Sequence, residues 1–369
     1  MKYLDEYRDS TAARKLLAEI RGSATNSWTL MEVCGGQTHS LLRYGIEAEL
    51  ADVIELIHGP GCPVCVTPPE AIDFAQELAL RDDVILASFG DMLRVPGGSR
   101  SLLDVQAVGG RVRSVYSPLD AVQLARKNPQ EYVVFFAVGF ETTAPATALA
   151  VQQAEREHLE NFSLLVAHVR VQPAMEALVQ SADNRVQGFL AAGHVCAVMG
   201  CESYHSFVEA HQLPVVVTGF EPLDLLQGIL ACVRQLEAGE ARVENQYARS
   251  VRSQGNQAAQ DIVHQVYEVC DRPWRGFGVV PRGGLRLRQS WRRFDASERF
   301  GESDRLPIFE AAQCRSADVL AGRIKPTECE AFGTTCVPDA PLGAPMVSSE
   351  GACAAYFRYR PHDAHTTES

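Results

Sequence analysis

Three cysteines near the start of the chain have the residue type and spacing for metal or redox chemistry. Cys62 and Cys65 stand two residues apart in the run His58-Gly59-Pro60-Gly61-Cys62-Pro63-Val64-Cys65, and Cys34 precedes two glycines. Two intervening residues let both sulfurs reach one metal ion, or each other as a redox disulfide. The three thiols therefore predict a sulfur-rich site for iron, copper(I) or zinc, or a dithiol pair beside a third thiol.

A structural role is the alternative for these three cysteines, because free cysteine is among the most buried residue types. Glycine and proline surround them in the sequence, however, and such loops make poor core material, which favours a functional role. His39 and His58 are close enough in sequence to add an imidazole to the site.

A second group of cysteines lies near the end of the chain, at Cys314, Cys329, Cys336 and Cys353. Four thiolates can hold a tetrahedral zinc ion or a 4Fe-4S cluster. Zinc sites more often contain paired short knuckles, so the dispersed spacing here modestly favours iron-sulfur, and zinc stays open. Few apolar runs occur around these cysteines. A region that buries little apolar surface usually needs a stabilising cross-link, and in a cytosolic protein this would be a metal centre.

The other four cysteines lie in apolar or helical contexts, at Cys196, Cys201, Cys232 and Cys270. The first two stand beside His194 and His205 and form a weaker candidate for a metal site. The last two are predicted to be core residues.

Predicted strands position the first group. The apolar runs 28–33 and 53–57 lead directly into the Cys34 loop and the Cys62/Cys65 loop, and helix-like stretches follow both. The carboxyl ends of parallel strands emerge at one edge of a sheet, where sites of open α/β proteins are built. If the two strands are neighbours, their three thiols converge.

The same pattern recurs further along the chain. Apolar runs at 83–89, 132–138 and 213–218 each end in glycine with an acidic residue close behind, and two of these acids are Asp91 and Glu141. Both are candidates for orienting or acid-base groups, although helix capping is the simpler role. Near-continuous apolar strands alternating with helices indicate a parallel α/β fold.

Composition excludes several classes of protein. A net charge of −12 and a pI near 5.4 argue against a generic nucleic-acid or anionic-membrane binder. The amino end does not resemble a signal peptide, and no run of eighteen apolar residues occurs, so we expect a cytoplasmic protein without membrane partners. No phosphate-loop motif is present, and Gly-x-Gly-x-x-Gly follows no strand.

Six motifs together resemble the HypD family of NiFe-hydrogenase maturation factors. They occur in the same order and span about residues 25–360. The motifs are 31–39 (MEVCGGQTH), 57–65 (IHGPGCPVC), 89–97 (FGDMLRVPG), 139–143 (GFETT), 219–228 (GFEPLDLLQG) and 346–353 (MVSSEGAC).

The resemblance implies a protein that works with a small HypC-type chaperone and carries iron while cyanide and carbonyl ligands are installed. A HypE-type partner, charged by a HypF-type carbamoyltransferase, would supply cyanide, and the hydrogenase large subunit would be an indirect partner. By the family pattern Cys34 binds the iron, Cys62 and Cys65 form the redox pair, and Cys314, Cys329, Cys336 and Cys353 bind a 4Fe-4S cluster.

The motifs also imply supporting residues around these thiols. Some relatives have histidine where this chain has Gln37, so an imidazole role at that position is not carried over, and His39 remains available. Glu350, within Ser348-Ser349-Glu350-Gly351, is a candidate to cap a helix or orient a ligand. The remaining supporting candidates are Gly35, Gly36, Thr38, His58, Asp91 and Glu141.

Pattern and resemblance together predict two parallel-sheet α/β domains facing a cleft, plus a mainly helical or irregular C-terminal iron-sulfur domain. The predicted ranges are an N-terminal helix at 1–25, α/β domains at 26–115 and 116–245, and a cluster domain at 246–369. The function hypothesis is a scaffold for assembling the Fe(CN)2CO unit, with iron on Cys34 and electrons from the cluster through Cys62 and Cys65. The alternatives are a stand-alone thiol-disulfide oxidoreductase with a structural zinc or iron-sulfur domain, and a docking scaffold with inert cysteines.

Overall fold

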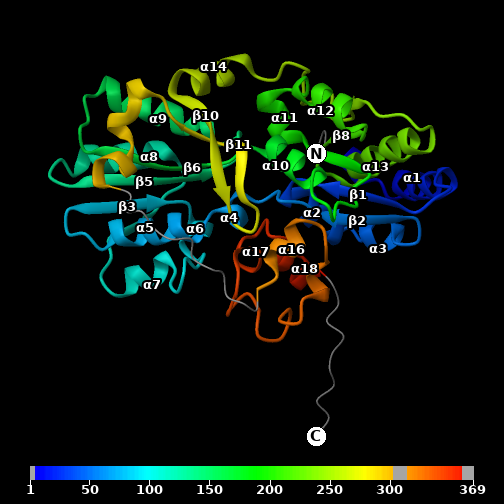
Figure 1. The fold of residues 1–369 in the computed structure, drawn as a ribbon, viewed down its shortest axis with the longest axis horizontal. Helices are drawn as coiled ribbons and strands as arrows, with labels where there is room; N and C mark the ends of the chain where they lie inside the picture. Colours follow the sequence, from blue (N-terminus) through cyan, green and yellow to red (C-terminus); the bar gives the residue numbers. More distant parts are fainter. Residues whose placement is uncertain (1–4, 302–313, 360–369) are drawn as a thin grey trace, which may run out of the picture.

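Two parallel β-sheets lie side by side, each covered by helices, and the cysteine-rich C-terminal segment sits against them on one side (Figure 1). This arrangement comes from a computed structural model, which describes residues 5–301 and 314–359. The prediction of an α/β protein with parallel sheets is confirmed.

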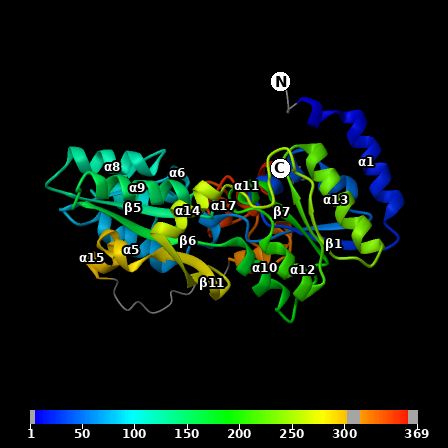
Figure 2. The same cartoon turned by 90° about the horizontal axis from the view of Figure 1, so that it is seen from above.

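The first sheet has five parallel strands in the order β2-β1-β7-β8-β9. Within it, Glu32 of β1 lies opposite His58 of β2, so the loops after these two strands leave the same edge. Helices α1 and α13 pack together over this sheet, far from the second sheet (Figure 2). The elements are β1 (Trp28–Glu32), β2 (Ile54–His58), β7 (Gly188–Ala192), β8 (Val215–Thr218), β9 (Val243–Asn245), α1 (Ser10–Ser23) and α13 (Pro222–Glu237).

The second sheet has four parallel strands in the order β4-β3-β5-β6. Alternate residues of β5 point to opposite faces: Phe135 packs among residues of α8 and α9, whereas Phe136 packs among residues of α5 and α7. Burial on both faces explains why these strands are continuously apolar. The elements are β3 (Val84–Ser88), β4 (Val112–Ser114), β5 (Tyr132–Gly139), β6 (Phe162–His168), α5 (Pro69–Ala79), α7 (Leu102–Ala107), α8 (Pro118–Lys127) and α9 (Ala144–Arg156).

The strands are not grouped in the contiguous ranges 26–115 and 116–245. The chain builds β1 and β2 of the first sheet, crosses to make all four strands of the second, and then returns for β7, β8 and β9. Apolar pattern identifies a buried strand but does not say which strand pairs with it, because every parallel neighbour requires a crossover connection.

Residues 257–300 also depart from the expected C-terminal organisation. They include an antiparallel pair of strands, and Tyr267, Leu285 and Phe294 pack into the core of the second sheet. The expectation of a mainly helical or irregular region from 246 onward therefore omitted a hairpin, whose arginines and glycines conceal its alternation. The elements are α14 (Gln257–Val266), β10 (Tyr267–Trp274), β11 (Gly278–Leu287), η2 (Gln289–Phe294) and α15 (Ala296–Phe300).

Short helices make most of the remaining connections. Those around the two sheets are η1 (Asp5–Arg8), α2 (Gly35–Arg43), α3 (Ile46–Leu50), α4 (Pro63–Val66), α6 (Gly90–Leu93), α10 (Val171–Val179), α11 (Gly193–Met199) and α12 (Ser203–His211). The four-cysteine region, defined here as residues 314–359, contains α16 (Ser316–Leu320), η3 (Pro326–Glu328), α17 (Ala344–Val347) and α18 (Ala352–Tyr359).

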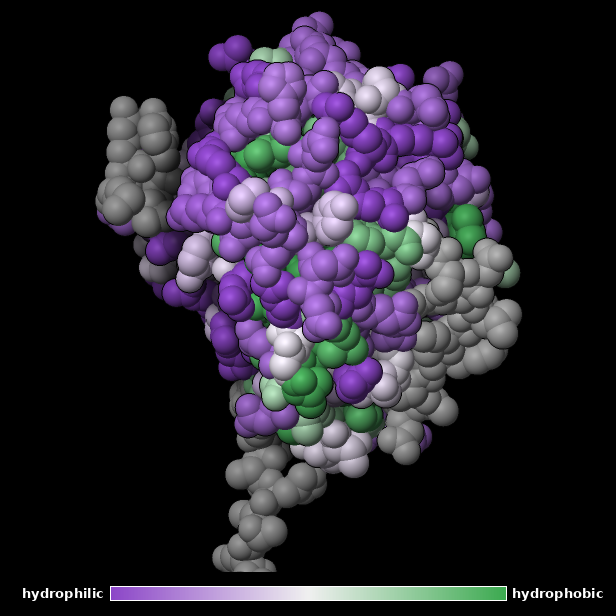
Figure 3. Space-filling model, turned by 90° about the vertical axis from the view of Figure 1, so that its left-hand side faces the viewer, coloured by the Kyte–Doolittle hydropathy of each residue, from purple (hydrophilic) through white to green (hydrophobic). Residues whose placement is uncertain are grey.

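The surface is largely polar at the end of the molecule formed by the second sheet. Figure 3 shows mainly hydrophilic residues there, with hydrophobic residues in small separate groups. Within residues 5–301 and 314–359, no helix is long and apolar enough to cross a membrane.

Candidate functional site

The Cys34 loop and the Cys62/Cys65 loop are in contact at the carboxyl edge of the first sheet. The strands β1 and β2 are direct neighbours, and the Gly35 amide donates a hydrogen bond to the Gly61 carbonyl at 3.0 Å. A Cβ atom at Gly61 would lie 2.3 Å from the Cys34 nitrogen, so only glycine permits this approach. The two loops thus lie together, as predicted for the ends of neighbouring parallel strands.

The two loops hold their thiols in different states. Cys62 and Cys65 form a disulfide with their Cα atoms 5.2 Å apart, and the Cys65 amide points at the Cys62 sulfur at 3.1 Å. Cys34 is free and buried. Burial raises the pKa of the Cys34 thiol, and the charges of Glu32 and Glu350 add to the shift. Cys34 is therefore a protonated thiol at neutral pH, and a metal ion bound there would displace its proton.

His194 supplies the imidazole nearest to Cys34. Its Nδ1 lies 3.6 Å from the Cys34 sulfur, at the start of α11, directly after strand β7. Burial lowers the pKa of His194, which favours the neutral ring, the form that can bind a metal. His194 was predicted only as part of a weaker metal site with Cys196 and Cys201. Its place directly after strand 188–192 is the signal that locates it at this edge.

Phe220 lies close to Cys34 and to the ring of His194. The centroids of the Phe220 and His194 rings lie 5.4 Å apart. A Cβ atom at Gly36 would lie 3.3 Å from the Phe220 ring and 3.7 Å from the Cys34 sulfur. Gly36 thus lets the Phe220 ring lie close to the Cys34 thiol. Residues from the loops after β1, β7 and β8 surround the thiol.

Gln37 and His39 point away from Cys34, although they share its helix. The buried Gln37 amide donates to the carbonyls of Ala191 and Thr218, both at 3.2 Å, and so fixes α2 to the ends of β7 and β8. Nε2 of His39 forms a 2.7 Å hydrogen bond with the Tyr359 hydroxyl. His39 also lines a surface pocket of about 300 Å³, and burial with nearby arginines lowers its pKa.

Glu32 organises the backbone of the Cys34 loop from below. This fully buried carboxylate accepts the Cys34 amide at 2.8 Å and the Thr38 hydroxyl, and it pairs with Nδ1 of His58 at 2.8 Å. A buried carboxylate without such partners would be strongly destabilising. Thr38 and His58 were predicted as supporting residues, whereas Glu32 was not, because it reads as an ordinary strand residue.

The three predicted acids lie in different surroundings. The backbone of Glu350 presses against Gly35, where a Cβ would lie 2.1 Å from the Glu350 carbonyl oxygen, and burial together with Asp91 raises the pKa of Glu350. Asp91 accepts the Ser349 hydroxyl at 3.0 Å. Glu141 is buried and accepts the Val171 amide at 3.1 Å, and burial raises its pKa. Glu350 thus joins the last motif to the Cys34 loop, and Asp91 joins it to α6.

The four C-terminal cysteines line one pocket. Burial raises the pKa of Cys353, and the charges of the other three cysteines raise it further, which reflects their proximity. A Cβ atom at Gly343 would lie 2.4 Å from the Cys314 sulfur, so a side chain there would clash with the thiol. Four thiols around one pocket fit a sulfur-bound metal group, whose positive charge would offset their mutual repulsion.

The four thiols do not converge as ligands of a single ion do. Within the described ranges, no three His, Cys, Asp or Glu side chains are placed to hold one metal ion. A zinc ion needs its ligands within about 2.3 Å of one point, whereas a four-iron cluster holds its thiolates further apart.

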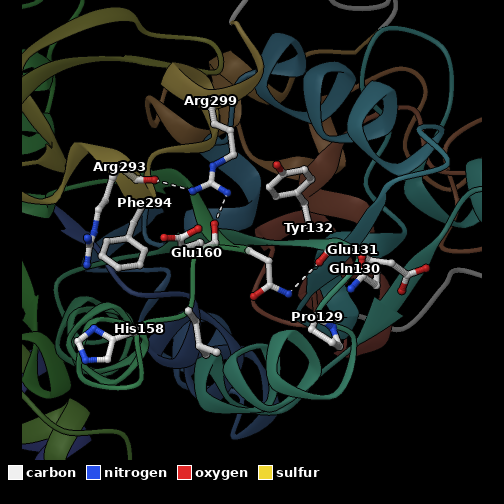
Figure 4. Close-up of a pocket in the computed structure, with 11 residues that line it drawn as sticks. Pro129, Gln130, Glu131, Tyr132, His158, Glu160, Arg293, Phe294 and Arg299 are labelled. Atoms are coloured by element: carbon white, nitrogen blue, oxygen red, sulfur yellow. Dashed lines mark hydrogen bonds between the residues drawn. The ribbon is translucent and has the colours of Figure 1, made fainter.

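Another pocket lies in the second sheet, at the amino ends of β5 and β6 (Figure 4). It encloses about 670 Å³. Arg299 crosses it and donates to the carbonyls of Glu160 and Arg293, above the ring of Tyr132. The Arg299 guanidinium is thus already hydrogen-bonded to the backbone of two segments. No cysteine lines this pocket.

Fold and site define an α/β thiol protein with a free cysteine beside a disulfide and a separate four-cysteine pocket. Comparison with known proteins specifies it further. The HypD family model, described as "Hydrogenase formation hypA family", matches residues 11–360. This chain belongs to the HypD family.

Named relatives cover nearly the whole chain. The "Hydrogenase maturation factor HypD" of Rhodobacter capsulatus is 48% identical over 372 residues, which are 97% of this chain and 98% of that protein. The "Hydrogenase expression/formation protein HupD" of Azotobacter chroococcum is 47% identical over 368 residues, with 97% of each chain covered. The HypD protein of Escherichia coli K12 is 44% identical over 368 residues, with 98% of each chain covered. The chain is thus similar over its length to hydrogenase maturation factors.

Proposed function

We propose that this protein scaffolds assembly of the Fe(CN)2CO unit of NiFe-hydrogenase, with the iron held at Cys34. The observation that carries the proposal is the free, buried Cys34 thiol with His194 Nδ1 at 3.6 Å and the disulfide loop against its backbone. A thiolate and an imidazole are good ligands for iron, and a partner's cysteine would complete a soft ligand set. Binding of iron would release the Cys34 proton to solvent, and the neutral His194 would offer Nδ1 as a ligand.

Cys34 lies in an enclosed site, which suits this cargo. Glu32 fixes the loop backbone, and Phe220 and Gly36 flank the sulfur. The buried position of the thiol limits access of water and of bulky molecules, which suits small diatomic ligands. In this proposal cyanide and carbonyl therefore meet the iron on the Phe220 side of Cys34.

The four-cysteine pocket would hold a 4Fe-4S cluster through Cys314, Cys329, Cys336 and Cys353. When bound, such a cluster supplies electrons one at a time. Reduction of the Cys62–Cys65 disulfide consumes two electrons and two protons and yields two thiols. The two thiols would then stand beside the iron-bearing Cys34, as reductant or as additional ligands.

The proposed partners follow from the family. A HypC-type chaperone would share the iron with Cys34, a HypE-type protein charged by a HypF-type protein would deliver cyanide, and the hydrogenase large subunit would receive the product through the chaperone. We place this work in the cytoplasm.

Infrared spectroscopy tests the proposal directly. The protein is purified without oxygen together with its HypC-type chaperone, and the cyanide and carbonyl stretching region is recorded. We expect bands in the wild type and none in Cys34→Ala, whose cluster iron should be unchanged. Bands of normal intensity in Cys34→Ala would overturn the iron assignment.

A thiol-disulfide oxidoreductase is the second candidate, because Cys62 and Cys65 form a disulfide at the start of a helix. Burial opposes it: Cys62 is 2% exposed and Cys65 is 0% exposed. A protein disulfide needs access to the attacking sulfur. Turnover of generic disulfide substrates without any partner would favour this alternative over the scaffold.

A further inference from the structure

Tyr356 lies at the meeting point of the two cysteine sites. It belongs to α18, three residues after Cys353, so the two side chains lie on neighbouring positions of one helix. The Tyr356 side chain is fully buried. Its hydroxyl lies 2.9 Å from Nε2 of His58 and 2.8 Å from Oε1 of Glu47.

The direction of these hydrogen bonds is determined by what each group can donate. Burial raises the pKa of Glu47, but His58, Lys325 and Tyr356 together outweigh it and lower the pKa, so the carboxylate only accepts. Tyr356 therefore donates its single hydroxyl hydrogen to Glu47 and accepts the Nε2 hydrogen of His58. Tyr356 thereby holds the His58 ring in one orientation, edge-on at 5.2 Å between centroids.

His58 carries the connection onward to Cys34. Its other nitrogen pairs with Glu32 at 2.8 Å, and the second oxygen of Glu32 accepts the Cys34 amide at 2.8 Å. One continuous set of buried hydrogen bonds thus runs from Tyr356 through His58 and Glu32 to the Cys34 backbone. Such a network holds its members in place only while every partner is present.

The other end of the network is also anchored in the four-cysteine region. Lys325 donates to Glu47 at 2.6 Å and stands four residues before Cys329. Tyr356 and Lys325 thus bring two segments, each within four residues of a pocket cysteine, onto the same carboxylate. The two cysteine sites are joined by hydrogen bonds as well as by packing.

We propose that Tyr356 is a positioning residue that makes the conformation of the Cys34 loop depend on an ordered four-cysteine region. The link to cluster content rests on the proposed function, since the cluster is what would keep that region ordered. Loss of the cluster would displace α18, release His58 and Glu32, and loosen the Cys34 amide. Iron would then be held firmly only on a protein that also carries its electron source.

Amide hydrogen exchange at Cys34 tests the proposal, because this amide donates to Glu32. Tyr356→Phe keeps the ring and removes only the hydroxyl. Tyr359→Phe is the matched control, since Tyr359 lies on the same helix but bonds His39 instead. We expect the Cys34 amide to exchange about tenfold faster in Tyr356→Phe than in Tyr359→Phe, with exchange in β5 unchanged in both.

Removing the iron tests the dependence on the cluster. In wild-type protein free of cargo iron, stripping the cluster with a chelator should accelerate exchange of the Cys34 amide as much as Tyr356→Phe does. In Tyr356→Phe the same treatment should cause little further acceleration. Glu47→Gln, which keeps the size of the side chain, provides a second variant and should accelerate the same amide by a smaller factor. Wild-type exchange at Cys34 in both Tyr356→Phe and Glu47→Gln would overturn the proposal.

The two proposals fail in distinguishable ways. Absence of iron and labile sulfide from anaerobically purified wild type would overturn the cluster assignment and the dependence on it. The comparison of Tyr356→Phe with Tyr359→Phe would still decide whether Tyr356 positions the Cys34 loop.

Discussion

The two cysteine sites of this protein are built by different means. Cys34 and the Cys62–Cys65 disulfide lie at the ends of adjacent parallel strands whose register is fixed by a hydrogen-bonded ladder. The four C-terminal cysteines are carried by loops and short helices, of which η3 has three residues and α17 has four. One site is held by a sheet, whereas the other is held by an irregular chain.

Each site therefore obtains its stability from a different source. The sheet buries its apolar residues on both faces, and this packing holds the strands that lead into the Cys34 loop without a metal. Around the pocket cysteines the buried apolar cluster is small, with Ala331, Cys336 and Met346 at its centre. A region with so little core depends on its bound group.

The largest expected effect comes from removing a pocket cysteine. In Cys329→Ser we expect iron and labile sulfide to fall nearly to zero and amide exchange in residues 314–359 to accelerate by about 100-fold or more, because metal binding and folding of such a region are coupled. Iron analysis and exchange mass spectrometry measure both.

Cys270→Ser is the control, because Cys270 lies in β10, outside both sites. It should keep the iron and the exchange pattern of the wild type. Iron loss without faster exchange in Cys329→Ser would show that the region is stable by itself and would remove the contrast between the two sites.

The difference in construction also explains what the sequence could predict. Apolar runs ending in Cys34 or in the Cys62/Cys65 loop identified the strands and the edge of the site, because a buried strand and its loop are local features. The four-cysteine group was identified by composition and spacing. Neither method shows partners that come from distant segments, such as His194 and Tyr356.

Residues that act through long-range contacts were missed for the same reason. Glu32 reads as a strand residue until β2 brings His58 opposite it. The crossing of the chain between two sheets, and the hairpin of β10 and β11, depend on pairing choices that local periodicity does not encode. His39 was favoured because it stands near Cys34 in sequence, yet the helix directs it to Tyr359.

A smaller effect is expected from crowding the sheet-held site. In Gly61→Ala the new methyl would meet the Cys34 backbone at 2.3 Å, so the loop must shift. We expect a loss of about 1–3 kcal/mol in the free energy of unfolding, measured by urea titration, with cluster iron unchanged.

Gly22→Ala is the matched substitution, because a Cβ there meets nothing within 4 Å and the residue lies in α1. It should cause no loss of stability. Loss of cluster iron in Gly61→Ala would show that a shift of the Cys34 loop is strong enough to disrupt the four-cysteine region.

The smallest expected effect concerns the protonation of Cys34 in protein free of cargo iron. Because burial, Glu32 and Glu350 raise the pKa of this thiol, its alkylation should stay slow through pH 8.5 and rise only at higher pH, whereas in unfolded protein it should level off above about pH 8.5. Glu350→Gln removes one of the charges and should shift the rise to lower pH, measured by peptide mapping of Cys34. Identical pH profiles in folded and unfolded protein would mean that the sheet edge does not suppress ionisation. Suppressed ionisation would instead show that a metal must displace the Cys34 proton, even though its ligand loop is already in place.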